Sequence, residues 1–187
     1  MIQEQYKVSS LLESTSNEDS SYAGMIALPE EHPISESEQE LRAYIQASHI
    51  TRRITHAVVH CAATQPTASV SSILNYWKNV LKWKNPGYHI LIGQKGFTVL
   101  ANFNEVTNGA VGYNGNGVHI SYIGGIDKAG KPLDTRNDLQ KRLIQVCLEE
   151  LKKKIPTLRV IGHNEVAAKA CPSFKVKDAY PQFWTGK

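Results

Sequence analysis

A histidine, a lysine and a cysteine lie within nine positions of one another in the stretch IGHNEVAAKACPSF, residues 161–174. His163 follows a short apolar run, and the seven residues after it are enough for the chain to fold back and bring Cys171 beside it. Imidazole nitrogens and thiolates are common zinc ligands in proteins. On spacing alone the pair fits two interpretations: a metal site, or a packed histidine near a buried thiol that acts as a small hydrophobic residue.

A second histidine that could reach the same site occurs in ITHAVVHCA, residues 54–62, whose β-branched and apolar residues predict a strand. Strand alternation puts His56 and His60 on one face and Cys61 on the other. Because four residues of strand span about 13 Å, the two histidines cannot bind one ion, and His60 lies nearer the carboxyl end. With the pair described above, His60 would complete a Cys-His-His set, and three protein ligands with an open fourth position are typical of catalytic zinc.

The segments that must position these residues have the patterns of an α/β domain. They comprise predicted helices at 69–83 and 134–156, a hairpin at 88–100 with the turn GQKG, and strands at 117–127 and 158–163. The apolar stripe of the first helix would consist of Val70, Ile73, Leu74, Trp77 and Leu81. Thr135 and Asp138 have the spacing of a capping box for the second helix, and Pro156 marks its end. The pattern predicts a single central mixed β-sheet flanked by helices, with polar residues from strand ends gathered along one edge.

The first 50 residues differ from the rest in charge and pattern. They contain nine acidic and two basic residues, a net charge of −7, so the remainder of the +4 chain carries +11. Residues 33–49 predict a short helix with Ser35 or Ser37 as its cap, and the rest of this segment has the composition of loop or disorder. The apolar stripe of that helix would consist of Leu41, Tyr44 and Ile45. We therefore predict an acidic N-terminal extension over residues 1–50 and a folded domain over residues 51–187.

Composition limits the classes of protein to which the chain can belong. At 187 residues with 41% hydrophobic residues, it is long enough for one domain with a real core. No run approaches the ~18 apolar residues of a membrane span, and the N-terminus lacks the features of a signal peptide, so we expect synthesis in the cytoplasm. Three cysteines without framework spacing argue against a disulfide scaffold, and Cys147 in the second long helix is expected in the core.

The basic part of the chain indicates an anionic partner, unless it is only a solvated surface of mixed charge. Nucleic acid, a membrane surface and an anionic cell-wall polymer are the three classes that such a charge would attract. The sequence has no helix-turn-helix pattern, no zinc-finger spacing and no aromatic-basic strand signature, so we do not expect nucleic acid as the partner.

Four motifs in order along the chain, VVHCAAT, GYHILI, GYNGNGVHISYIGGID and GHNEVAAKACPSF, resemble the zinc-dependent N-acetylmuramoyl-L-alanine amidases of the type 2 family. The resemblance is closest to the amidase-type lysozymes of bacteriophages, the endolysins, and extends to peptidoglycan recognition proteins. It covers residues 54–184, and its last motif is the most specific. It implies that residues 51–187 form a catalytic domain that hydrolyses the amide between N-acetylmuramic acid and L-alanine in bacterial peptidoglycan. Such an enzyme would be a monomer that reaches the wall after its release from the cytoplasm.

The resemblance also implies roles for five residues. The family's zinc ligands fall on His60, His163 and Cys171, which would hold Zn2+. Its catalytic tyrosine and lysine fall on Tyr88 and Lys169. The lysine would stabilise the tetrahedral intermediate of amide hydrolysis, and the tyrosine hydroxyl would orient water or donate to the oxyanion.

Other polar residues near these motifs are expected to have supporting roles or depart from the family pattern. His89, on the strand face opposite to the tyrosine before it, would pack or support the site, and Glu165 would be a local capping or salt-bridge residue. Related phage enzymes often carry a histidine just before GYN, where this chain has Gly109 and Ala110. His119 stands where the family commonly has a small residue, and it could face the groove or pack inside the domain.

Two alternatives to a wall-degrading enzyme follow from the same resemblance. A noncatalytic peptidoglycan-binding module could keep this fold, but such proteins characteristically lose the cysteine ligand, and Cys171 is present. A cytosolic amidase that recycles wall fragments is the other alternative, and those enzymes typically use an aspartate in place of the cysteine.

Overall fold

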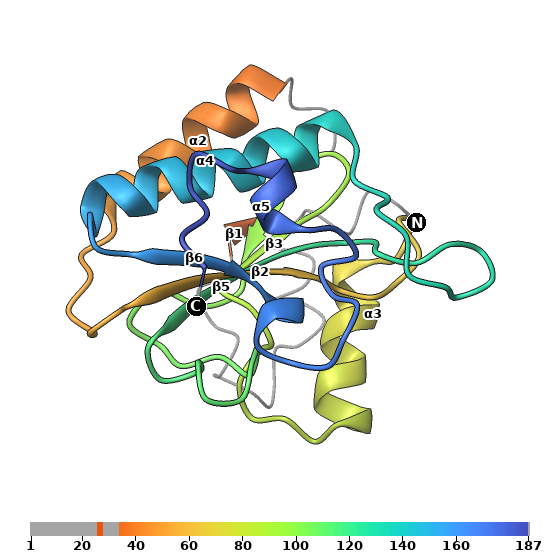
Figure 1. Cartoon of the computed structure of the whole chain (residues 1–187). Coiled ribbons are helices and arrows are strands. Elements are labelled where there is room, and N and C mark those ends of the chain that lie inside the picture. Colours follow the sequence, from red (N-terminus) through yellow and green to blue (C-terminus); the bar gives the residue numbers. More distant parts are fainter. Residues whose placement is uncertain (1–25, 28–33, 187) are drawn as a thin grey trace.

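The computed structural model describes residues 26–27 and 34–186, and a six-stranded mixed sheet runs through the middle of this part of the chain (Figure 1). The strands are β1 (Ile26–Ala27), β2 (His56–Cys61), β3 (Ile90–Ile92), β4 (Phe97–Val99), β5 (Gly117–Tyr122) and β6 (Arg159–Gly162). Their order across the sheet is β1-β4-β3-β5-β2-β6. The neighbours β3, β5, β2 and β6 are parallel, whereas β4 pairs antiparallel with β3 and with β1. The predicted fold class is confirmed.

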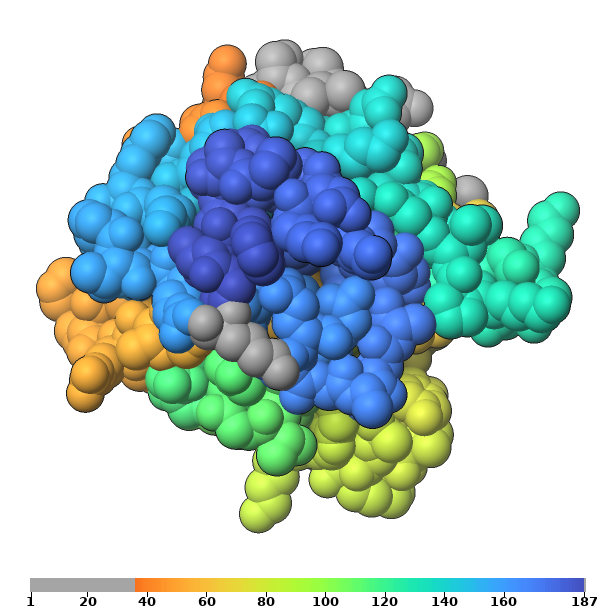
Figure 2. Space-filling model, viewed as in Figure 1, coloured from red at the N-terminus to blue at the C-terminus, as the bar shows by residue number. Residues whose placement is uncertain are grey.

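Helices cover both faces of the sheet. They are α2 (Ile34–Ala47), α3 (Val70–Asn75) continued by the π-helical turn η3 (Tyr76–Val80), α4 (Asp138–Lys154), the 3-10 turn η4 (His163–Glu165) and α5 (Val176–Ala179). In Figure 1, α2 and α4 lie together over one face and α3 lies on the opposite side. Among the described residues, no helix combines the length and apolar character needed to cross a bilayer. In the space-filling view of Figure 2, the blue C-terminal part of the chain forms much of the surface on the side where β6 lies.

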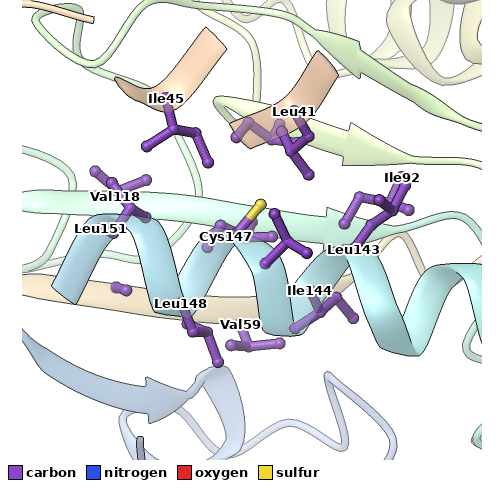
Figure 3. Close-up of a cluster of buried hydrophobic side chains, with 14 of the residues drawn as sticks. Leu41, Ile45, Val59, Ile92, Val118, Leu143, Ile144, Cys147, Leu148 and Leu151 are labelled. Carbon is purple, nitrogen blue, oxygen red and sulfur yellow. The ribbon is translucent and has the colours of Figure 1, made fainter. Parts of the chain in front are cut away.

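The main core lies between the sheet and the helices α2 and α4. Figure 3 shows Leu143, Cys147 and Leu151 along one side of α4, packed toward the sheet and toward Leu41 and Ile45 of α2. All five side chains are fully buried, and the core position predicted for Cys147 is confirmed. Complete burial of one leucine or isoleucine contributes about 1.5–3 kcal/mol, so this layer is a major source of stability.

A second, smaller core lies on the α3 face of the sheet. It contains Val70, Ile73, Trp77, Leu91, Leu100 and Ile123. The predicted continuous helix over 69–83 is wrong in its second half, because the N–H of Leu81 donates to the carbonyl of Tyr76, five residues back. A π turn is wider than an α turn and rotates the residues that follow it. Leu81, expected on the buried stripe, is consequently 37% exposed.

The N-terminus of α4 is capped by residues other than those predicted. Asn137 is the N-cap; its side chain accepts from the Gln140 N–H at 2.8 Å, and the Gln140 side chain accepts from the Asn137 N–H at 3.1 Å. The predicted box of Thr135 and Asp138 therefore starts two residues too early. The Thr135 hydroxyl instead accepts from the N–H of Gly125 at 2.9 Å, which anchors the loop after β5.

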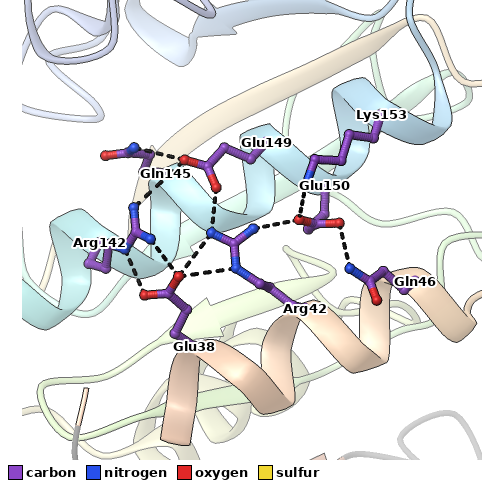
Figure 4. Close-up of polar contacts among 8 residues, drawn as sticks. All are labelled: Glu38, Arg42, Gln46, Arg142, Gln145, Glu149, Glu150 and Lys153. Atoms are coloured by element: carbon purple, nitrogen blue, oxygen red, sulfur yellow. Dashed lines mark hydrogen bonds and ion pairs between the residues drawn. The ribbon is translucent and has the colours of Figure 1, made fainter. Parts of the chain in front are cut away.

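Helix α2, which lies within the predicted extension, packs against α4 and contributes Leu41 and Ile45 to the main core. The helix itself is confirmed, but it begins at Ile34, so Ser35 and Ser37 lie inside it and neither is its cap. Its Arg42 pairs with Glu38 at 2.9 Å, with Glu149 at 2.5 Å and with Glu150 of α4 (Figure 4). Glu38 of α2 also pairs with Arg142 of α4 at 2.5 Å, so ion pairs join the two helices in both directions.

Candidate active site

Two histidines meet where the parallel strands β2 and β6 end. The strand register pairs Val59 with Gly162, so the next residues along the two strands, His60 and His163, become neighbours. Strand β6 ends at Gly162, and His163 begins the short turn η4. The Nδ1 atoms of the two imidazoles are 3.2 Å apart, and both rings are buried. The two Nδ1 atoms therefore face a common position.

The loop after η4 brings Cys171 to the same point. Its Sγ lies 3.7 Å from Nδ1 of His60 and accepts a hydrogen bond from the main-chain N–H of Cys61 at 3.2 Å. Three hydrogen bonds hold this loop in place. They join Tyr122 Oη to the Pro172 carbonyl at 2.8 Å, Asn164 Nδ2 to the Phe174 carbonyl at 3.1 Å and Ser173 Oγ to the Gly125 carbonyl at 2.7 Å. The thiol is therefore positioned by contacts on both sides of it.

The three side chains form a group that could hold a metal ion. One ligand atom from each of His60, His163 and Cys171 lies within 4.8 Å of the others, and no other such group of three or more occurs in the part of the chain that the structure describes. Two imidazole nitrogens and one sulfur, without a carboxylate, suit a borderline or soft transition metal rather than calcium or magnesium. Three donors leave at least one coordination position for water or substrate.

Burial and neighbouring charges set the protonation of the three side chains. Burial, followed by the neighbouring His119, His163 and Lys169, holds the pKa of His60 well below its usual range. Burial and Lys169 likewise lower the pKa of His163, so both imidazoles are neutral at neutral pH and offer a lone pair. The adjoining Cys61 thiol and burial raise the pKa of Cys171. Metal binding would therefore release the Cys171 proton.

Tyr88 and Lys169 lie at the edge of this group. The Tyr88 ring centroid is 5.1 Å from that of His60, and its hydroxyl donates to the Cys61 carbonyl at 3.2 Å. Burial raises the pKa of Tyr88, so the phenol keeps its proton and acts as a hydrogen-bond donor. Lys169 is exposed, but its charge acts on both imidazoles and on the thiol of Cys171. The pair thus supplies a neutral donor and a cation beside the histidines.

The remaining residues singled out in the sequence have other surroundings. His56 contacts Thr55 Oγ1 at 2.8 Å through its Nδ1 and the edge of the Tyr113 ring, away from the three-residue group. Glu165 accepts from the Gly162 N–H at 2.6 Å and from Trp184 Nε1 at 2.9 Å, which agrees with a local capping role. Neither residue is available as a ligand or a proton acceptor at the site.

His119, for which the sequence allowed either packing or a place in the groove, is a fully buried neighbour of the site. Its Nδ1 lies 2.9 Å from Nε2 of His60, on the side of that ring away from His163. Burial lowers the pKa of His119 to about 4 and that of His89 to about 3, so both rings are neutral at neutral pH. Alternation along β5 puts His119 on the same face of the sheet as His60, but only the pairing of β5 with β2 brings them into contact.

Comparisons with known proteins give two sets of sequence matches. A family model described as N-acetylmuramoyl-L-alanine amidase matches residues 50–174. The endolysin of Escherichia phage T7 is 37% identical over 130 residues, which cover 67% of this chain and 85% of the relative. The endolysin of Klebsiella phage KP32 is 33% identical over 121 residues, which cover 64% of this chain and 80% of the relative.

Solved structures share the fold at lower sequence identity. The Ph2119 endolysin from a Thermus scotoductus MAT2119 bacteriophage matches with a TM-score of 0.60 at 17% identity, over 74% of this chain and 87% of that one. A human peptidoglycan recognition protein, PGRP-IBETAC, solved in complex with glycosamyl muramyl pentapeptide, matches with a TM-score of 0.58 at 20% identity, over 77% of this chain and 96% of that one. At these identities the likeness concerns the fold alone.

Proposed function

The chain belongs to the N-acetylmuramoyl-L-alanine amidase family, and from this we propose that it is a zinc-dependent amidase of bacterial peptidoglycan that acts as a phage endolysin. The bond cleaved is the amide between the lactyl group of N-acetylmuramic acid and the L-alanine that begins the stem peptide. The observation that carries the zinc part of the proposal is the convergence of His60, His163 and Cys171 on one position.

The donor chemistry of this group fits zinc. Zinc is bound by imidazole nitrogen and thiolate sulfur, and its catalytic sites keep three protein ligands and an open position. In the metal-free protein the two imidazoles are neutral and the Cys171 thiol is protonated. The main-chain N–H of Cys61 donates to the Cys171 sulfur, a contact that would stabilise the thiolate formed when this thiol loses its proton to a metal. The chemistry that zinc supplies at such a site is polarisation of the substrate carbonyl and activation of a water molecule at neutral pH.

Two residues of the chain would act on the substrate itself. Tyr88 is a protonated donor whose ring lies beside that of His60, and its hydroxyl donates to the Cys61 carbonyl in this structure. On substrate binding this hydroxyl would turn to donate to the oxygen on which negative charge develops. Lys169 carries a positive charge that acts at the same position and, being exposed, can move toward a bound substrate. Both would stabilise the tetrahedral intermediate more than the planar amide, which is the requirement for catalysis.

The family and its relatives support a proposal for the substrate and the place of action. The human peptidoglycan recognition protein with this fold was solved with a muramyl pentapeptide, and the phage relatives are endolysins. We propose intact bacterial peptidoglycan as the substrate, with the cell wall as the site of action and a monomer as the working form. The +11 charge of residues 51–187 would favour association with an anionic wall.

The test is an assay of new amino termini released from purified sacculi by four preparations of the protein. These are the protein as purified, the protein stripped of metal, the stripped protein with one equivalent of zinc, and zinc-loaded Cys171→Ser. Cys147→Ser is the matched control, since its thiol is buried on α4 in the main core. We expect stripping to abolish release from the unaltered protein and zinc to restore it. Of the two cysteine variants, we expect Cys147→Ser to be active with zinc and Cys171→Ser to be inactive.

Two results would contradict the proposal. One is full activity in a stripped sample that elemental analysis shows to be free of metal. The other is zinc-dependent activity in Cys171→Ser equal to that of the Cys147→Ser control. Zinc binding without any release from sacculi would instead favour a noncatalytic wall-binding module, and release from soluble muropeptides alone would favour a recycling amidase.

A further inference from the structure

His119 is a buried imidazole that none of the roles described above requires. Its ring lies between those of His60 and His89, with centroid distances of 5.1 Å and 6.0 Å. It is fully buried, and its Nδ1 is 2.9 Å from Nε2 of His60. Its Nε2 is buried without a hydrogen-bond partner among the described residues, and such burial is costly, so the contact of Nδ1 with a candidate ligand offsets part of that cost.

The direction of this hydrogen bond follows from the geometry of His60. Its Nδ1 faces Nδ1 of His163 and Sγ of Cys171, so Nδ1 must be free of a proton to bind a metal there. A neutral imidazole carries one proton, which must then lie on Nε2. Nε2–H of His60 therefore donates to Nδ1 of His119, and His119 must keep that nitrogen unprotonated.

The backbone around His119 holds it in the orientation that this bond needs. Its main-chain N–H donates to Nδ1 of His89 at 3.0 Å, and Nε2 of His89 lies 3.1 Å from the Glu105 carbonyl, to which it donates. The His119 carbonyl accepts from the His89 N–H at 2.9 Å. These contacts fix the backbone of His119 and the ring of His89 relative to each other.

Gly109 provides the space that the His119 ring occupies. A Cβ atom at position 109 would lie 2.3 Å from Nδ1 and 2.4 Å from Cγ of His119, closer than atoms can approach. The sequence departs from the family pattern at two places: it has no histidine at Gly109 or Ala110, and it has a histidine at position 119. These two places are thus neighbours in space. The side chain of His119 fills the volume that a side chain at position 109 would take.

We infer that His119 is a positioning residue for the metal site. Its Nδ1 accepts the Nε2–H of His60 and so holds the His60 ring in the tautomer and orientation that present Nδ1 of His60 to the metal. This inference rests on the proposed zinc function. Partners of this kind raise the basicity of a ligand and fix its rotation, and their removal typically weakens metal binding about 10- to 100-fold. His119 would touch neither the substrate nor the metal itself.

The test compares two substitutions of similar size. His119→Asn keeps an amide oxygen about where the imidazole Nδ1 lies, whereas His119→Leu keeps the volume and removes the acceptor. Zinc affinity is measured by competition with a chromophoric chelator, and the stability of each metal-free protein is measured by urea unfolding. We expect zinc binding to weaken about 10- to 100-fold in the leucine variant and to be largely retained in the asparagine variant.

A second measurement does not depend on how well the variants fold. Long-range proton–nitrogen NMR spectra of the unaltered, zinc-loaded protein report which nitrogen of His60 carries the proton, and we expect Nε2. Three results would overturn the inference. They are equal zinc affinity in the unaltered protein and the leucine variant, equal losses of zinc affinity in both variants, and a proton on Nδ1 of His60. If the unaltered protein binds no zinc, the proposed function fails first, and the inference falls with it.

Discussion

Lowering the pH from 6.5 to 4.5 should destabilise the metal-free protein by about 4 kcal/mol through His89 and His119 alone. Burial lowers their pKa values to about 3 and about 4, whereas a histidine in the unfolded chain titrates near 6.5. Between these values the unfolded state binds more protons than the folded state, so the free energy of unfolding falls as the pH falls. A difference of one bound proton between the unfolded and folded states is worth about 1.4 kcal/mol per pH unit. Because the unfolded histidine is only half protonated at pH 6.5, each ring contributes about 2 kcal/mol over this range.

Between pH 6.5 and 4.5 the change in stability comes mainly from the histidines, because the carboxylates lose their contribution mainly at lower pH. Glu38 has a lowered pKa because of its hydrogen bond to Arg142, so its contribution is present above its unfolded pKa of 4.5 and is lost only at lower pH. His60 and His163 also have lowered pKa values and would add to the loss, which makes about 4 kcal/mol a lower bound. The measurement is urea unfolding in the presence of a chelator at steps of half a pH unit.

Substitution identifies the source of the effect. His119→Asn removes one titrating ring and should reduce the pH-dependent loss by about 2 kcal/mol, whatever it does to stability at pH 6.5. His49→Asn, at an exposed histidine, is the matched control for the same change of residue type. A change below about 1 kcal/mol between pH 6.5 and 4.5 in the unaltered protein would refute the reasoning, since two buried neutral imidazoles cannot give so little.

Two further predictions concern catalysis and the α2–α4 contact. Tyr88→Phe should lower kcat on sacculi roughly 100- to 1000-fold if its hydroxyl stabilises the oxyanion, with zinc affinity unchanged, and a loss confined to KM would argue against that role. Arg42→Met should lower the free energy of unfolding by about 2 kcal/mol, because Glu150, whose side chain is 2% exposed, loses a partner but keeps Lys153 and Gln46. Lys141→Met, which removes an exposed pair with Asp138, is the control in the same urea unfolding and should change stability by less than about 1 kcal/mol.

The parts of the molecule that could be predicted from the sequence are those set by local periodicity. Alternation in 54–62 assigned His60 and Cys61 to opposite faces, and the structure has Cys61 in the main core and His60 on the other face. The hairpin turn was also predicted correctly, since the N–H of Gly93 donates to the carbonyl of Gly96 at 2.9 Å. Such features depend on residues close together in the chain, so a short window contains the information that they need.

The parts that could not be predicted depend on contacts between distant segments. The contact of His119 with His60 requires the register of β5 on β2, which no local pattern specifies. An amphipathic helix shows which face it buries but not what it packs against, so α2 was assigned to an extension although it completes the core over α4. The cap of α4 was missed for a smaller reason. Two capping boxes two residues apart compete, and the tertiary bond from Gly125 engages Thr135.

The central claim, that this chain cuts the bond between the glycan strand and its peptide, is tested most directly by mass spectrometry of a digest. Purified sacculi are incubated with the zinc-loaded protein, beside a sample with chelator and one with Cys171→Ser, and the soluble products are identified. The account predicts free stem peptides that begin with L-alanine, together with glycan strands that carry an unsubstituted lactyl group, in the zinc-loaded sample alone. Muropeptides that keep the lactyl–alanine amide intact in every sample, despite measured zinc in the protein, would contradict it.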